Sequence, residues 1–145
     1  DATISVTLID TNTDPIFLYP FEDLWLETSL GNLTFCSGGT VADASTDENG
    51  QTTFTNPIAG GSYTDPTSEM TMVMVAGAPI AGGGVDVQFN SPDISGDLVV
   101  NLTDIVTFTG FLGGGYSFSG DFNNDGVINL SDIVRFTGGI GAACP

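Results

Sequence analysis

The first half of the chain alternates between apolar and polar residues. Ile4, Val6 and Leu8 are separated by Thr or Ser, and this period of two predicts a strand over Ala2–Ile9 with one buried face. Other short apolar runs, bounded by Gly, Pro, Asn and Asp, predict six more strands: Ile16–Tyr19, Leu24–Thr28, Leu33–Cys36, Gln51–Phe54, Met70–Ala76 and Val85–Phe89. Seven short strands with regular turns predict a mainly β domain over residues 1–89, folded as a small sandwich. Asn49-Gly50 predicts a tight hairpin turn, and Gly60-Gly61 a second turn.

The pattern changes near Asn90, and residues 90–145 contain an internal repeat. Asp93–Gly110 and Asp121–Gly138 are identical at eleven of eighteen positions when shifted by 28 residues. In each repeat an oxygen-rich segment precedes an apolar stripe at helical spacing. The stripes predict two short helices that pack on each other through Ile105, Phe108, Leu112, Ile133, Phe136 and Ile140. We therefore expect a second, small helical domain over residues 90–145.

The charge balance limits the possible functions. The chain has 18 acidic residues, one basic residue (Arg135) and no histidine, for a net charge of −17. Phosphate contacts require Lys and Arg, so nucleic acid is excluded as a partner, and anionic membrane surfaces are disfavoured. No apolar run is long enough to insert into a membrane. Without histidine or lysine there is no ordinary general base, so we expect a protein that is not an enzyme. The carboxylates must be solvated, bonded to backbone N–H groups or bound to metal ions.

The segment Asp121–Asp132 has the oxygen spacing of a calcium loop. Oxygen side chains stand first, third, fifth, ninth and twelfth, with Gly126 sixth, which is the spacing of an EF-hand loop. The predicted ligands are Asp121, Asn123, Asp125, the Val127 carbonyl, Asn129 (directly or through water) and Asp132. Asn129 also stands where it can cap the following helix. Ile128 is expected to form a short β-bridge with Val100, its counterpart in the other repeat.

The upstream segment Asp93–Asp104 follows the same pattern less closely. Its predicted ligands are Asp93, Ser95, Asp97, the Val99 carbonyl, Asn101 and Asp104. Leu98 stands where glycine is expected, so we predict a strained or altered turn and weaker binding. The sequence thus predicts two calcium ions, with the Asp121 loop as the stronger site.

The paired loops, each followed by a helix, resemble a type I dockerin over residues 93–138. The segment Thr46–Phe54 resembles, over nine residues, a hairpin of carboxypeptidase-regulatory-like and transthyretin-like sandwiches. The dockerin resemblance implies a bacterial extracellular protein that binds a cohesin-like β-sandwich. In cellulosomal dockerins the helices often carry Ser-Thr where this chain has Leu102-Thr103 and Leu130-Ser131.

Several expectations about compartment and partners follow. Cys36 and Cys144 lack zinc or redox spacing, so they form a disulfide within the chain, join two subunits or remain free thiols. A chain that starts at Asp1 and is rich in Ser, Thr and Gly favours a processed protein that is secreted or displayed on a cell surface. We expect an extracellular assembly protein that attaches to other subunits, including copies of itself in a filament. The alternatives are an adaptor for a separate cohesin scaffold and a carbohydrate-binding module that uses Trp25, Tyr19 or Tyr63.

Overall fold

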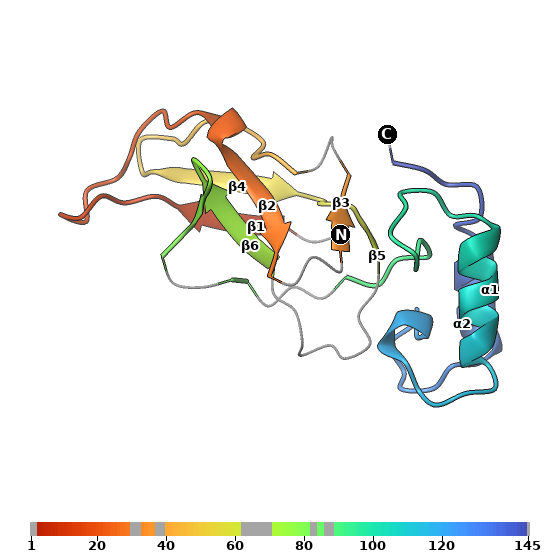
Figure 1. The fold of residues 1–145 in the computed structure, drawn as a ribbon. Coiled ribbons are helices and arrows are strands. Elements are labelled where there is room, and N and C mark those ends of the chain that lie inside the picture. The colour runs from red at the N-terminus through yellow and green to blue at the C-terminus, as the bar shows by residue number, and fades with distance from the viewer. Residues whose placement is uncertain are drawn as a thin grey trace.

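The protein is mainly β, with a pair of helices at one end (Figure 1). The computed structural model describes residues 3–29, 33–36, 40–61, 71–81, 84–85 and 89–144. In this part of the chain there are seven strands: β1 (Thr3–Thr7), β2 (Leu24–Thr28), β3 (Leu33–Phe35), β4 (Gln51–Thr55), β5 (Ala59–Gly61), β6 (Thr71–Val75) and β7 (Ala78–Pro79). The helices are α1 (Leu102–Phe111) and α2 (Leu130–Thr137), together with the 3-10 turns η1 (Phe21–Asp23) and η2 (Phe118–Gly120).

The strands form three small antiparallel sheets, paired as β1–β4, β2–β6–β7 and β3–β5. The alternation predicted for β1 is confirmed, because Ile4 and Val6 are buried and their neighbours are exposed. One apolar cluster joins the first two sheets, with contributions from Ile4, Val6, Leu8, Leu24, Leu26, Ala42, Phe54 and Val73. Burial of these side chains, at about 1.5–3 kcal/mol for each large one, is the main stabilising contribution in this region.

The predicted strand Ile16–Tyr19 is wrong. This segment instead wraps around Thr46, whose buried hydroxyl donates to the Ile16 carbonyl (2.5 Å) and accepts from the Tyr19 N–H (2.8 Å). Leu18 adopts a positive φ of 56° and is exposed. Long-range hydrogen bonding to one threonine therefore determines a backbone path that the apolar run does not reveal.

Two short strands were missed by the sequence pattern. β7 pairs with β6, and β5, which contains the expected Gly60-Gly61 turn, pairs with β3. Val85 forms a single bridge with Thr71, and the rest of the predicted strand over 86–88 lies outside the described residues, as do Ala2 and Met70. The Asn49-Gly50 turn is present, but it runs from Asp47 to Gly50, and of these residues only Gly50 has a positive φ.

The two helices pack on each other through their repeat-related phenylalanines. The rings of Phe108 and Phe136 stack with centroids 4.8 Å apart, and Phe122 packs beside both. Ile105 and Ile133 join this cluster with Ile94 and Val100, as the apolar stripes predict, whereas Leu112 and Ile140 are largely exposed. None of the described helices is long and apolar enough to span a membrane.

Candidate metal centre

Each repeat folds its oxygen-rich segment into a loop around a buried aspartate. In the upstream loop, Asp93 Oδ1 accepts from the N–H groups of Gly96 (2.9 Å) and Asp97 (3.2 Å), and Oδ2 accepts from the Leu98 N–H (2.8 Å). In the downstream loop, Asp121 Oδ1 accepts from the Asp125 N–H (3.1 Å) and Oδ2 from the Gly126 N–H (2.8 Å). The backbone of both loops therefore curls around the first residue of the predicted ligand set.

The last residue of each loop closes it in the same way. Asp104 accepts from the N–H groups of Ser95 and Asn101 at 2.8 and 2.9 Å. Asp132 accepts from the N–H groups of Asn123 and Asn129 at 3.2 and 2.9 Å. The twelfth-position carboxylate thus connects the start of each loop to the start of the helix that follows.

Asn101 and Asn129 cap the two helices, as predicted for Asn129. The side-chain Oδ1 of Asn101 accepts from the Thr103 N–H (2.8 Å), and Oδ1 of Asn129 accepts from the Ser131 N–H (2.7 Å). Together with Asp104 and Asp132 they form a reciprocal capping box at each helix start. Each loop is therefore continuous with its helix, and ligand positions nine and twelve are fixed by helix formation.

The sixth loop position differs in sequence between the two repeats but has the same backbone conformation. Leu98 has a φ of 70° and Gly126, its counterpart, has a φ of 84°. The turn is therefore the same in both loops, and in the upstream loop a leucine occupies a left-handed conformation that costs about 1–2 kcal/mol. The fourth position is also left-handed in both loops, at Gly96 and Asn124, a feature that the sequence pattern does not reveal.

Four buried carboxylates have no basic side chain available to pair with them. Asp104, Asp121 and Asp132 are fully buried and Asp93 is 4% exposed, whereas Arg135, the only basic residue in the sequence, is exposed on α2. Burying a carboxylate without a cation is costly even when backbone N–H groups donate to it. The chemistry of this donor set, oxygen only and strongly negative, fits a hard divalent cation.

The spacing of the oxygens in the upstream loop fits such an ion. One carboxylate oxygen from each of Asp93, Asp97 and Asp104 lies within 4.8 Å of the others. Oxygens bound to one calcium ion at about 2.4 Å can be separated by at most about 4.8 Å. Among the described residues, the group of three carboxylates with this spacing is therefore in the upstream loop. The sequence predicts the Asp121 loop as the stronger site, and that order stays a prediction. Asp97 and Asp125 are both exposed, so each loop opens toward solvent at its fifth residue.

The remaining predicted ligands lie within their loops and bond locally. The Ser95 hydroxyl donates to Asp93 (3.3 Å), and the Asn123 amide donates to Asp125 Oδ2 (2.9 Å). The Val99 and Val127 carbonyls accept from the side-chain amides of Asn101 (3.1 Å) and Asn129 (3.3 Å). The role of these residues as ligands stays a prediction.

Tyr116 adds a contact at the downstream loop that the sequence pattern did not reveal. Its hydroxyl donates to Asp121 Oδ2 at 2.9 Å. Burial acts to raise the pKa of Asp121, but hydrogen bonds from the Gly126 N–H, the Tyr116 hydroxyl and the Asp125 N–H outweigh it and lower that pKa. Burial and the contact with Asp121 together raise the pKa of Tyr116. Asp121 is therefore held as a carboxylate, the form that binds metal.

The expected β-bridge between Val100 and Ile128 is wrong. The Val100 N–H donates to the Ala142 carbonyl (2.8 Å), and the Val100 carbonyl accepts from the Gly141 N–H (2.9 Å). Val99 forms an antiparallel bridge with Ala143. The C-terminal tail therefore pairs with Val100 in place of Ile128 of the second loop.

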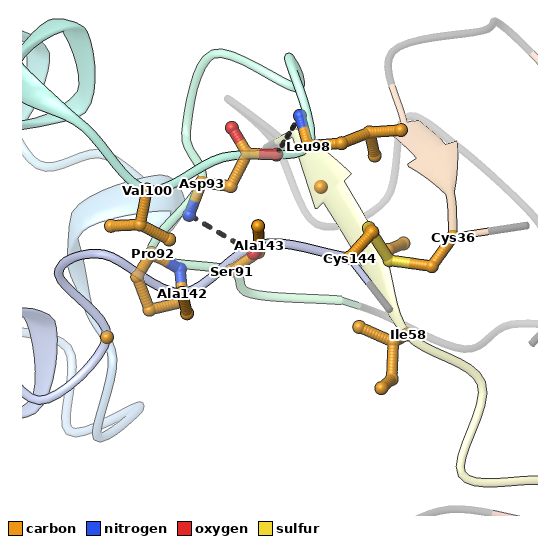
Figure 2. Close-up of a pocket in the computed structure, with 13 residues that line it drawn as sticks. Cys36, Ile58, Ser91, Pro92, Asp93, Leu98, Val100, Ala142, Ala143 and Cys144 are labelled. Carbon is orange, nitrogen blue, oxygen red and sulfur yellow. Dashed lines mark hydrogen bonds between the residues drawn. A yellow bond between two sulfur atoms is a disulfide. The ribbon is translucent and has the colours of Figure 1, made fainter. Parts of the chain in front are cut away.

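Cys36 and Cys144 form a disulfide within the chain, with their Cα atoms 5.4 Å apart. This confirms one of the three alternatives that the sequence left open. The bond attaches the tail to the β part of the molecule, next to the Asp93 loop (Figure 2).

The aromatic residues considered for carbohydrate binding are dispersed or packed. The Trp25 ring N–H donates to Glu27 (2.7 Å), and Trp25 lies opposite Met74 across β2 and β6. Tyr19 packs against the main apolar cluster, and Tyr63 lies outside the described residues.

No protein-family model matches the chain, and no curated protein matches it.

Proposed function

We propose that this chain is a secreted, non-enzymatic calcium-binding assembly protein. Residues 1–89 act as a small sandwich of immunoglobulin or transthyretin type, and residues 90–145 as a dockerin-like module that binds two calcium ions. The single observation that carries this proposal is the set of four buried carboxylates, two in each loop, in a chain whose one basic side chain is exposed elsewhere. Two divalent ions would compensate these four charges.

The proposed ligands are the residues that the loop spacing selects. The upstream ion is held by Asp93, Ser95, Asp97, Val99, Asn101 and Asp104, and the downstream ion by Asp121, Asn123, Asp125, Val127, Asn129 and Asp132. Calcium supplies the positive charge that lets the buried carboxylates approach one another. The chain's own contribution is to orient those oxygens through backbone N–H donors and to begin a helix at the end of each loop.

The assignment of a sandwich rests on the shared core. The inward faces of the β1–β4 sheet and the β2–β6–β7 sheet supply the same apolar cluster. Two sheets that face each other across one core are the defining feature of a sandwich. A β part of this kind is suited to protein contacts.

The exposed faces of the helices support a role in attachment. Leu102 and Val106 on α1, and their repeat counterparts Leu130 and Val134 on α2, are 64–76% exposed. Apolar residues repeated at the same exposed positions of two neighbouring helices favour an interface with another protein. We propose that this surface attaches the module to another subunit, which in a filament is the sandwich of a neighbouring copy. The alternative is an adaptor in which the same surface binds a separate cohesin-like scaffold.

Sedimentation in calcium and in chelator tests this proposal. We expect the wild type to form large assemblies in calcium and to dissociate in chelator, because loss of the ions unfolds the helix pair. Val134→Asp should abolish assembly while leaving calcium binding intact. Gly113→Asp, which adds the same charge at an exposed position after α1 where a Cβ meets nothing within 4 Å, should assemble normally. A calcium-loaded monomer would favour the adaptor, and a chain that binds no calcium would contradict both versions.

A further inference from the structure

We infer that the ion in the Asp93 loop is held jointly by both parts of the chain, so that its affinity depends on β5 and on the Cys36–Cys144 disulfide. The Asp121 loop contacts the β part through Phe118 instead, and its ion does not depend on Gly60 or on the disulfide. This inference rests on the calcium binding proposed above. It follows from three sets of contacts.

The first set joins the Asp93 loop to β5. The Gly61 N–H donates to the Asp93 carbonyl at 2.6 Å. A side chain at Gly60 would overlap Asp93, because a Cβ built there meets the Asp93 Oδ2 atom. The carboxylate that begins the ligand set therefore packs into the space left by a glycine of the other part. This requirement explains the glycine at position 60.

The second set joins the same loop to the C-terminal tail. The Cys144 N–H donates to the Leu98 carbonyl (3.1 Å), and Val99 and Val100 pair with residues 141–143 as described above. The tail is covalently attached to Cys36, whose N–H donates to the Ile58 carbonyl (2.8 Å) just before β5. Asp93, Leu98, Ile58 and the disulfide line one pocket of about 270 Å³. Figure 2 shows these residues around it. The loop is thus held between β5 and a tail that the disulfide fixes to the same region.

The third set distinguishes the Asp121 loop. Its first ligand is held by Tyr116 and by the side-chain amide of Asn90, which donates to the Asp121 carbonyl at 2.6 Å. Both residues belong to the same part of the chain as the loop itself. Phe118, three residues before Asp121, packs on Leu33 and Ala59 of the β part. These contacts differ from those of Gly60 and the disulfide, so a change at Gly60 or at the disulfide acts on the first ion and leaves the second unchanged.

Coupling between two sites is reciprocal in free energy. If the disulfide raises calcium affinity at the Asp93 loop, calcium at that loop must stabilise the disulfide against reduction by the same factor. Reduction by a dithiol such as dithiothreitol breaks the S–S bond and gives two cysteine thiols, while the dithiol is oxidised to its cyclic disulfide. Calcium should therefore oppose this reaction.

Calorimetric titration of variants with calcium tests the inference. Gly60→Ala should lower the affinity of one of the two ions by about 10- to 100-fold, as removal of a residue that orients a metal ligand does. Gly113→Ala is the matched control, since a Cβ there meets nothing within 4 Å. The Cys36→Ser, Cys144→Ser double variant should also bind one of the two ions with lower affinity. Terbium luminescence excited through Tyr116, whose hydroxyl lies 2.9 Å from Asp121, reports on the downstream loop and should be unchanged.

A second measurement decides the matter if Gly60→Ala does not fold. In a dithiothreitol redox buffer, calcium should shift the equilibrium of the disulfide toward the oxidised form by at least about fivefold. The shift should persist in Asp125→Ala and disappear in Asp97→Ala, two substitutions at equivalent exposed ligands. Two ions that bind with unchanged affinity in Gly60→Ala and in the double cysteine variant, together with a disulfide equilibrium that calcium does not shift, would overturn the inference and leave the proposed function intact. A wild type that binds no calcium would instead refute the proposed function.

Discussion

The Asp93 and Asp121 loops have nearly the same internal hydrogen bonds but different neighbours. In both, the first aspartate accepts from the N–H groups of the fifth and sixth residues, and the twelfth accepts from the third and ninth. The upstream loop is enclosed by β5 and the disulfide-linked tail, whereas the downstream loop is held by Tyr116 and Asn90. The repeated sequence therefore determines the shape of each loop, and the tertiary contacts determine what each loop is connected to.

The largest expected effect comes from removing the buried closing carboxylates. Asp104→Ala and Asp132→Ala should each lower the free energy of unfolding in calcium by about 3–5 kcal/mol, because two N–H groups and a bound cation lose their partner. In chelator the loss should be smaller, since the removed carboxylate was itself buried without a cation. Denaturant unfolding in the two conditions measures the difference.

Asp43→Ala provides the control for this pair. Asp43 is an exposed carboxylate that accepts from the hydroxyls of Thr53 and Thr55 in the β part. Its removal should have the same small effect with and without calcium. If Asp104→Ala and Asp132→Ala behaved in the same calcium-independent way, the two loops would be ordinary turns.

An intermediate effect is expected at the sixth loop position. Gly126→Ala places a side chain at a φ of 84° where a Cβ meets nothing within 4 Å, so strain alone is added. The cost should be about 1 kcal/mol, or about fivefold in affinity at the downstream loop, bringing it closer to the Leu98-containing upstream loop. Calorimetry measures the affinity. Gly113→Ala, with an unstrained backbone, should leave the affinity for both ions unchanged. An unchanged affinity in Gly126→Ala would show that the turn differs from the one described.

The smallest effect is a pH dependence of the free energy of unfolding that comes from three carboxylates of the β part. A hydrogen bond from the Thr53 hydroxyl lowers the pKa of Asp43, and backbone N–H groups of Asp14 and Gln51 lower those of Asp10 and Asp47. A carboxyl whose folded pKa lies below its unfolded value contributes stability above about pH 4 and loses it as the pH falls through the folded pKa.

Urea unfolding of the chelated protein, followed by Trp25 fluorescence, should therefore show a gradual loss of stability below about pH 4. Asp43→Asn should make this decline shallower by removing one of the three groups. A stability that stayed constant or rose on acidification would contradict the described hydrogen bonds.

The parts that could be predicted from the sequence are those that short-range patterns encode. The period-two alternation locates β1, and the repeat locates both loops and both helices, including the Asn129 cap. The segments that the pattern missed depend on distant partners. The backbone path of Ile16–Tyr19 is set by hydrogen bonds to Thr46. Val100 pairs with the C-terminal tail rather than with Ile128. β5 requires glycine at position 60 because Asp93 packs against it. Likewise, Cys36 and Cys144 are 108 residues apart in the sequence, and this spacing alone does not show that they bond to each other.

The central claim is that each loop closes around a divalent cation, and diffraction from crystals grown in calcium tests it most directly. Anomalous difference density should show two peaks, one about 2.3–2.6 Å from oxygens of Asp93, Asp97 and Asp104, and one at the same distances from oxygens of Asp121, Asp125 and Asp132. Well-ordered loops without a peak at either position, at a calcium concentration in the millimolar range, would contradict the claim.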